Sequence, residues 1–423
     1  MKYTEQILVA LILLISANVF SQNKTEYRDK IYKDGIKTVL FYRAGWEFTA
    51  PVLELNSDKK LILSFDDLND EVTDYYYTVI HCSANWEPSD LNPIEYIQGY
   101  EEEQIENFEN SFGTLVQYTH YTLTFPNENM QPEISGNYIL LVYEDYDRNK
   151  PVLTRRFYVA DTKLEIKASV QRASYVTDMN TSQELKITVT DKNNYITNPQ
   201  DNFSATVLQN NDQNIMLENI KPDFIKGNVY EFYNPRKLKF KGGNEYRYFN
   251  VKSEKYLTER IKAISFGRPY YYFELIPEVC NPSFTYSYMQ DINGDFLITA
   301  DNTENPATEA DYVYVDFTLY KEKPFLKGEV YVYGTLSDRS CDKKNKMTYD
   351  YGKKAYTLRM LLKQGFYNYR YVICDNGVPE LDYTEGNYYQ TENNYMIFIY
   401  NRPQGGQYDE LAAYIVVNSL KIH

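Results

Sequence analysis

Short runs of β-branched and aromatic residues, separated by polar turn clusters, recur along almost the whole chain. Lys60–Phe65, Tyr75–Cys82 and Thr119–Phe125 are three such runs. Residues of these types fit a pleated, half-buried surface, and short strands at this spacing are typical of antiparallel sandwiches rather than βαβ units. The pattern therefore predicts an all-β chain. Asn92–Phe108 is the one segment that we expect to form a short helical or irregular insertion.

The length of 423 residues exceeds that of one ordinary domain, which is about 150 residues. The series of strands restarts after residue 160 and again after residue 273, which predicts three consecutive antiparallel β-sandwiches of immunoglobulin-like or early-set type. Their expected bounds are 22–160, 161–273 and 274–423. In the middle module, Lys241-Gly-Gly-Asn244 predicts a tight hairpin turn, because glycine tolerates positive φ.

Alternation is clearest in the last module. In Tyr367-Asn-Tyr-Arg-Tyr371, the three tyrosines are expected to share one face of a strand, while Asn368 and Arg370 lie on the other. Tyrosine is abundant in the whole chain, at 45 of 423 residues. It favours strands, and its amphipathic ring packs on protein or on sugar.

The N-terminal segment Met1–Ser21 is predicted to be a secretory signal peptide. Lys2 supplies a positive charge, Ile7–Ile15 is an unbroken apolar run, and small or polar residues follow it. This run is shorter than the roughly 20 residues that a transmembrane helix needs. We therefore expect an exported, soluble protein that is cleaved near Ser21.

The charge balance excludes two classes of partner. The chain has 44 Lys and Arg against 59 Asp and Glu, a formal net charge of −15. Phosphate backbones and anionic membrane surfaces repel such a protein. We expect no nucleic-acid partner and no direct membrane insertion.

The four cysteines show neither C-x-x-C nor zinc spacing. Export permits disulfides, and Cys341 with Cys374 is the expected pair if one forms, because both lie in the last module. The alternative is that these two, with Cys82 and Cys280, are free thiols that pack as small hydrophobes.

One string partly matches a metal-binding motif. Asp291-Ile-Asn-Gly-Asp295 begins like a calcium-binding EF-hand loop, but Phe296 stands where glycine is needed and Asn302 replaces the bidentate Glu. We therefore expect a hairpin with Asn293-Gly294 at its turn.

No catalytic constellation emerges from the sequence. His81 and Cys82 are adjacent on a predicted strand, so their side chains point to opposite faces and do not form a nucleophile–base pair. The hydrolase, P-loop and dinucleotide-binding patterns are missing from the sequence. We therefore predict a protein without enzymatic activity, metal or cofactor.

Specific strings stand in a fixed order along the chain: Asp74–Cys82, Asn85–Leu91, Tyr118–Tyr121, Leu123–Glu128, Ser135–Tyr138, Val142–Asp145, Lys150–Phe157, Tyr389–Asn394, Ile399–Pro403 and Tyr408–Asp409. Together they resemble the plug proteins of the type IX secretion system of Bacteroidetes. The resemblance covers most of the chain that would remain after signal cleavage.

The resemblance implies a periplasmic protein, monomeric when free, that binds the periplasmic opening of a giant outer-membrane translocon barrel. It seals that opening when no cargo is engaged. Such barrels reach about 36 strands in the largest known case, so a bulky, rigid object is needed to close one. In the irregular segment of the first module, Trp86, Tyr96 and Tyr100 are the residues that we expect at this interface. The alternative for Trp86 is a ring that folds back to cap its own sandwich.

Two other functions stay open on the sequence. The first is a secreted glycan-binding β-sandwich protein, because Gly328–Leu336 and Gly365–Val372 resemble early-set sandwiches attached to polysaccharide enzymes. That module has no Trp to stack on sugar, so tyrosine would have to substitute. The second is a calcium-dependent hydrolase that uses an acidic cluster such as residues 66–74.

Overall fold

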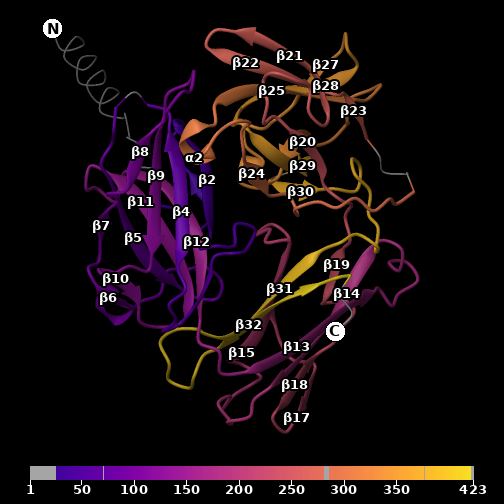
Figure 1. Ribbon diagram of the computed structural model, residues 1–423. Coiled ribbons are helices and arrows are strands. Elements are labelled where there is room, and N and C mark those ends of the chain that lie inside the picture. Colours follow the sequence, from indigo (N-terminus) through magenta and orange to yellow (C-terminus); the bar gives the residue numbers. More distant parts are fainter. Residues whose placement is uncertain (1–24, 70, 281–284, 376, 421–423) are drawn as a thin grey trace, which may run out of the picture.

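The structure is a computed structural model that describes residues 25–69, 71–280, 285–375 and 377–420. The predicted signal peptide, Met1–Ser21, lies outside the described residues. Strands arranged in three β-sandwiches make up nearly all the regular structure (Figure 1). The helical elements of the described part are single turns: η1 (Pro93–Glu95), α2 (Pro306–Glu309) and η2 (Thr335–Ser337). The predicted all-β sandwich class is confirmed.

The first sandwich contains two facing sheets and a core rich in aromatic rings. The larger sheet has the order β1 (Lys30–Ile31), β12 (Pro151–Ala160), β11 (Gly136–Glu144), β5 (Tyr75–Cys82) and β7 (Glu103–Gln104), with β3 (Val52–Glu54) parallel to β12. The facing sheet has the order β2 (Ile36–Arg43), β4 (Leu61–Asp67), β9 (Thr119–Phe125) and β8 (Phe108–Asn110), and β10 (Met130–Pro132) pairs separately with β6 (Ile97–Gly99). Phe65 stacks on Tyr121 with ring centroids 5.1 Å apart.

The middle sandwich combines strands that lie far apart in the sequence. One sheet has the order β13 (Glu165–Arg172), β14 (Ser182–Thr190), β18 (Val229–Phe232) and β17 (Phe224–Lys226), and β19 (Lys239–Lys241) also pairs with β14. The other has the order β16 (Met216–Ile220), β15 (Phe203–Gln209), β31 (Asn394–Asn401) and β32 (Glu410–Asn418). The last two strands of the chain therefore complete the middle core, where Figure 1 shows them in yellow.

The third sandwich has β29 at the centre of one sheet. The strands β20 (Arg247–Asn250), β24 (Phe296–Ile298), β26 (Glu329–Tyr333) and β30 (Val378–Glu380) all pair with β29 (Gly365–Asp375). The other sheet has the order β21 (Ile261–Gly267), β22 (Tyr270–Leu275), β25 (Tyr312–Tyr320), β28 (Ala355–Lys363) and β27 (Thr348–Asp350), with β23 (Glu278–Val279) beside β25. Tyr367, Tyr369 and Tyr371 of β29 are buried together in this core, which confirms the predicted alternation.

The strand pairing differs from the expected division at residue 273. Residues 247–273, expected in the middle module, join the third sandwich, and residues 394–418, expected in the third, join the middle one. The hairpin expected at Lys241–Asn244 is wrong, because β19 and β20 lie in different sheets and this segment crosses between sandwiches. At that crossing a Cβ on Gly242 would stand 2.0 Å from the carbonyl oxygen of Tyr388, so only glycine fits. Alternation indicates a strand without indicating its partner, which explains the misassignment.

An apolar cluster joins the first sandwich to the middle one. Tyr158 of β12 stacks on Phe398 of β31 with ring centroids 4.1 Å apart. Leu208 and Leu411 of the middle sandwich are buried in the same cluster. Because this contact is apolar and continuous with both sheets, it holds the two sandwiches as one body.

A buried ion pair joins the first sandwich to the third. Lys363 Nζ lies 2.6 Å from Asp66 Oδ2, and 1% and 0% of the two side chains are exposed. The Tyr312 hydroxyl donates to the same carboxylate oxygen, and His120 Nδ1 lies 2.6 Å from the other. Burial lowers the pKa of Lys363. Breaking such a pair leaves an uncompensated charge, so it fixes how the sandwiches dock.

The predicted disulfide between Cys341 and Cys374 is confirmed. It fastens the loop that follows β26 to the end of β29. The thiol of Cys82 is free and buried. For this residue, the alternative expectation of a free thiol that packs as a small hydrophobe holds.

We predict that the double substitution Cys341→Ser and Cys374→Ser lowers the free energy of unfolding. The bridge spans 33 residues of sequence, and closing a loop of that length stabilises a chain by about 3–4 kcal/mol. Urea unfolding followed by near-ultraviolet circular dichroism measures the shift. Reduced wild-type protein is the control and should show the same lowered midpoint. Equal midpoints for oxidised wild type and the double variant would contradict the prediction.

Candidate docking surface

Trp86 is not an exposed anchor, contrary to the expectation from the sequence. Its exposed fraction is 4%, and its backbone has φ of 66° in the turn after β5. The guanidinium of Arg156 lies 4.2 Å from the ring centroid, and Tyr158 packs against the ring edge at 5.2 Å. The ring therefore caps the cluster between the first and middle sandwiches, and the capping alternative describes it better.

Tyr96 and Tyr100 differ from each other in their exposure to solvent. Tyr96 is 6% exposed and packs against His81, with ring centroids 5.8 Å apart, so its expected role as an exposed anchor is also wrong. Tyr100 is 64% exposed. Of the three expected interface residues, only Tyr100 presents its ring to solvent.

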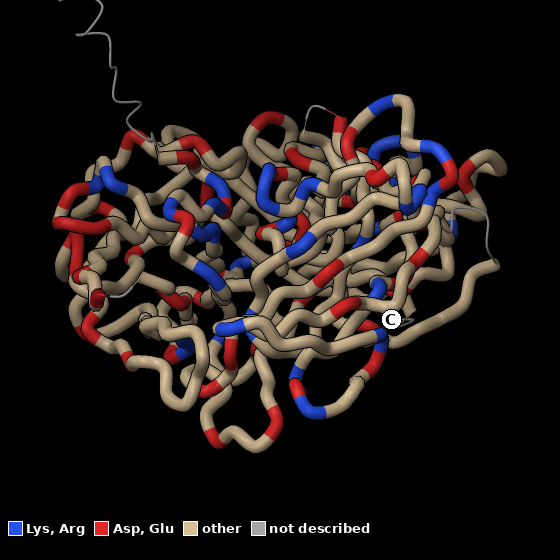
Figure 2. The backbone as a smooth tube through the Cα atoms, turned by 90° about the horizontal axis from the view of Figure 1, so that it is seen from above, with Lys and Arg blue, Asp and Glu red and all other residues tan. Residues whose placement is uncertain are grey.

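Tyr100 lies within a long stretch of chain that carries no positive charge. Residues 61–147 contain 18 Asp and Glu and neither Lys nor Arg. Exposed members of this stretch line the β7–β8 side of the first sandwich, and Figure 2 shows Asp and Glu gathered along this margin at the left. We call this surface the acidic face; its residues are Ile94, Glu95, Tyr100, Glu101, Glu106, Phe108, Glu109 and Phe112, all exposed.

The acidic face combines carboxylates with exposed apolar rings. Ile94 is 74%, Phe108 43% and Phe112 78% exposed. Exposed apolar side chains scattered singly are normal, whereas several within one short stretch, here residues 94–112, are typical of an interaction surface. The net charge of the whole chain does not locate this surface. The signal in the sequence that does locate it is the run of residues 61–147 without Lys or Arg.

Buried tyrosines hold the segment that carries Tyr100. The Tyr143 hydroxyl donates to Glu102 at 2.5 Å, and the Tyr77 hydroxyl donates to Glu103 at 2.5 Å. The backbone N–H of Tyr100 donates to the carbonyl of Asn129 at 2.7 Å. Two of the three consecutive glutamates therefore fix the segment, while Glu101 stays exposed.

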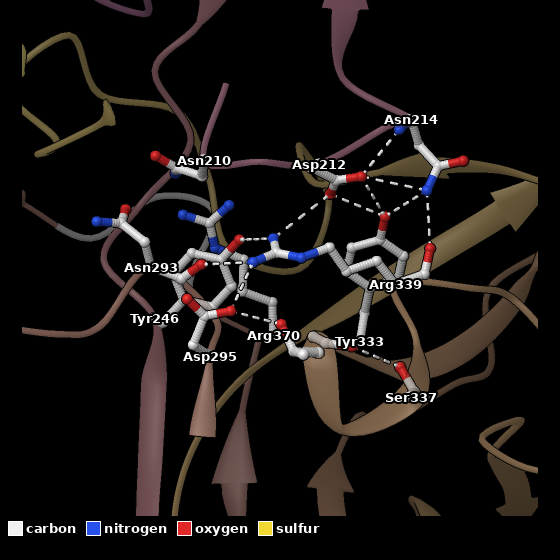
Figure 3. A network of polar contacts seen from close by, with 12 residues as sticks. Asn210, Asp212, Asn214, Tyr246, Asn293, Asp295, Tyr333, Ser337, Arg339 and Arg370 are labelled. Atoms are coloured by element: carbon white, nitrogen blue, oxygen red, sulfur yellow. Dashed lines mark hydrogen bonds and ion pairs between the residues drawn. The ribbon is translucent and has the colours of Figure 1, made fainter. Parts of the chain in front are cut away.

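Behind this surface, the three sandwiches meet at a buried polar junction (Figure 3). The Tyr333 hydroxyl of β26 donates to Asp212 of the middle sandwich at 2.8 Å. The Arg339 guanidinium lies 3.2 Å from Asp295 and 4.0 Å from Asp212. A cavity of about 380 Å³ lies beside them, between all three sandwiches.

The loop after β26 contacts all three sandwiches at once. Asp338 and Arg339 have positive φ of 52° and 47°. Arg155 of β12 pairs with Asp338 at 2.7 Å, whereas Arg339 reaches Asp212 on the other side. Each of the two consecutive residues therefore binds a different neighbouring sandwich.

The opposite face of the tyrosine strand completes the junction. Arg370 of β29 lies with its guanidinium 3.6 Å from the Tyr246 ring centroid and donates to the carbonyl of Asn244. Asn368 accepts a hydrogen bond from the N–H of Ile292 at 2.6 Å. The polar face of β29, with Asn368 and Arg370, thus binds the segment that crosses between the middle and third sandwiches and the turn before β24.

A buried carboxyl at the same crossing has a raised pKa. Glu245 is 6% exposed, and its pKa is raised to about 7, with burial as the largest cause. The charge of Asp291 acts in the same direction, whereas the hydroxyl of Tyr286, the N–H of Glu392 and the charge of Arg370 oppose the rise in this pKa. Glu245 Oε2 has no hydrogen-bond partner among the described residues.

The partial motifs of the sequence turn out to be structural. Asn293 and Gly294 have positive φ of 54° and 86°, so the expected turn is present, but the expected hairpin is wrong, because β24 after the turn pairs with β29 and residues 285–292 before it form no strand. Asp291 accepts the N–H of Tyr246 at 2.5 Å, so its carboxylate is used within the fold. His81 Nδ1 lies 2.9 Å from Ser89 Oγ, and burial lowers the pKa of His81 to about 4. Within the described ranges, no group of three or more His, Cys, Asp or Glu side chains is arranged to hold a metal ion.

Residues 36–161, which form most of the first sandwich, match the family model of the type 9 secretion system plug protein 1st domain. The chain belongs to the type IX secretion system plug protein family. A hypothetical protein from Parabacteroides merdae ATCC 43184, with a crystal structure at 2.30 Å resolution, is similar over nearly the whole length. It shares 36% identity, with 93% of this chain and 100% of that chain covered and a TM-score of 0.89.

Comparison with curated proteins gives no match. In the part of the chain that the structure describes, no helix has the length and apolar character needed to cross a membrane. The match to the plug-protein family model therefore carries the family assignment.

At the junction, we predict that Asp212→Ala lowers the free energy of unfolding by about 3–5 kcal/mol. The substitution leaves the Tyr333 hydroxyl buried without its acceptor and removes one of the two carboxylates beside Arg339, and a broken buried pair costs that much. Guanidinium unfolding curves measure the loss. Glu329→Ala, which breaks an exposed pair with Lys346, is the matched control and should change stability by less than about 1 kcal/mol. Similar losses in the two variants would contradict a special role for the junction.

For Glu245, we predict a stability slope with pH that Glu245→Gln removes. Since the folded state holds this proton more tightly than the unfolded state, the free energy of unfolding falls as pH rises from 4.5 through about 7. Urea unfolding of both proteins at pH 5, 6, 7 and 8 gives the difference. If the free energies of unfolding of the two proteins differ by the same amount at all four pH values, the prediction is contradicted.

Proposed function

We propose that the protein is a non-enzymatic periplasmic plug that binds the periplasmic opening of the type IX secretion translocon barrel and seals it when no cargo is engaged. Family membership supports a role in type IX secretion. The finer proposal is carried by one observation: each pair of sandwiches is locked by a buried contact. These contacts are Tyr158 with Phe398, Lys363 with Asp66, and Arg339 with Asp212.

Rigidity and size are the two properties that a stopper needs. A compact chain of 423 residues has a radius of gyration of about 22 Å. Modules on flexible linkers move independently and leave gaps, whereas three sandwiches with buried polar contacts between them move as one body. This supports obstruction of a wide pore as the mechanism.

The acidic face is our proposed docking surface. Exposed rings at Tyr100, Phe108 and Phe112 supply apolar anchors, and the surrounding carboxylates attract a basic rim at the barrel mouth. An interface of this composition is polar enough to be released, as in non-obligate complexes. Its strength should fall with salt, because exposed charges are screened.

The direct test of the plug role is the permeability of the outer membrane. Deleting the gene should admit dyes and antibiotics that wild-type cells exclude, and the full-length protein supplied in trans should restore exclusion. Cells without the protein that remain equally tight, with the translocon free of cargo, would overturn the proposal.

For the acidic face, we predict that the combination Tyr100→Ala, Glu101→Lys and Glu106→Lys lowers co-purification with the solubilised barrel. All three side chains are exposed, so the fold is preserved, while loss of an aromatic anchor and reversal of two charges weaken docking about tenfold or more. The measurement is the yield of barrel in affinity purification at fixed salt.

The matched control makes the same chemical changes elsewhere. Tyr351→Ala, Glu259→Lys and Glu322→Lys lie at exposed positions of the third sandwich or next to it and should leave the yield unchanged. If both triple variants bind the barrel like wild type, docking does not use the acidic face, while the permeability test of the plug role still stands.

A further inference from the structure

The hairpin of β21 and β22 leaves one edge of the third sandwich open. β21 is the terminal strand of its sheet, and Figure 1 shows this hairpin at the top of the molecule. Among the described residues, no backbone hydrogen bond joins residues 262–267 to any segment other than β22. Unpaired N–H and C=O groups along a terminal strand are a template for another strand.

The outer face beside this edge has the composition of a protein-recognition surface. Ala263 and Ser265 of β21 lie opposite Glu274 and Tyr272 of β22, so small side chains separate the open edge from a tyrosine. The Tyr272 ring stacks on Tyr314 with centroids 5.3 Å apart. A side chain of an added strand reaches across small neighbours to such rings, because diagonal positions lie within contact distance for aromatic residues.

The inner face also offers apolar support at the edge. Phe266 is 51% exposed and packs on Tyr271 with ring centroids 4.8 Å apart. Ile264 is half-buried and packs against the core of the third sandwich. An added strand therefore meets apolar groups on both of its faces, which favours β-branched or aromatic residues in the incoming segment.

The charges at the edge select the partner. Lys262 is paired with Glu274 at 2.6 Å. Arg268, exposed at the tip of the hairpin, has no ion pair with any residue that the structure describes. The uncompensated charge at this edge is therefore positive, and it fits an acidic residue on the incoming strand.

We propose that β21 is a docking edge for an extended segment of a partner protein. The segment adds to the sheet as a further strand, has β-branched or aromatic residues, and carries Asp or Glu opposite Arg268. This is strand addition, in which the backbone bonds give affinity and alternate side chains give specificity. A second copy of this chain fits less well, because antiparallel self-pairing brings Arg268 of one copy near Lys262 of the other. The proposal is independent of the acidic face, which lies on the first sandwich.

Site-specific photo-crosslinking in the native cells tests this edge. The full-length chain carries p-benzoylphenylalanine at Ala263, Ser265 or Phe266, and the controls carry it at Leu326 or Tyr351, which are 101% and 79% exposed on the same sandwich. The edge positions should capture one protein at least about fivefold more efficiently than the controls. Mass spectrometry should place the crosslinks on one continuous segment of that protein, stepping along it in register.

A charge reversal supplies the second arm. Arg268→Glu should lower the crosslinking yield about fivefold, whereas Lys353→Glu, exposed in the turn before β28, should leave it unchanged. Unfolding midpoints of all variants equal to that of wild type ensure that the hairpin is intact. Equal yields at edge and control positions, crosslinks scattered over the partner, a crosslinked dimer of this chain, or no product at all would each overturn the proposal.

Discussion

The charged groups buried between the sandwiches are the constraint on which the rest of the structure depends. Asp338 and Arg339 are consecutive residues with left-handed backbones, a conformation that costs about 1–3 kcal/mol at each non-glycine residue. Their side chains bind opposite neighbours, Arg155 in the first sandwich and Asp212 in the middle one. Moving the first sandwich away removes the cation that pairs with Asp338, and moving the middle one away leaves Arg339 with Asp295 alone. The loop therefore makes its full set of ion pairs only when all three sandwiches are docked.

The sequence predicted the strands well and their partners poorly. Tyr75–Cys82 and Thr119–Phe125 were expected as strands with the bounds that the structure shows, because alternation is a local property of neighbouring side chains. The pairing of β15 with β31 joins residues nearly 200 positions apart, and no local pattern encodes such a choice. A chain that leaves one sandwich, builds another and returns therefore looks like three consecutive modules in its sequence.

The sequence predicts which candidate interface residues are exposed only where no distant segment of the chain covers them. Trp86 lies among prolines and polar residues, which is typical of an exposed loop, yet Arg156 and Tyr158 from a distant strand cover its ring. Tyr100 keeps its exposure because the segment around it pairs at the margin of the sandwich. The local charge run over residues 61–147 needs no tertiary information, so a charge profile along the chain locates this surface where the net charge alone does not.

The placement of charge separates the two tasks that a removable plug must perform. Ion pairs such as Lys363 with Asp66 are nearly fully buried, so salt screens them weakly and they hold the body together under changing conditions. A buried pair contributes little net stability compared with apolar packing, but it penalises every other arrangement of the sandwiches strongly. The carboxylates of the acidic face are exposed, so their attraction for a partner is weak per group and reversible. Rigidity therefore comes from charges removed from water, and release comes from charges that remain in it.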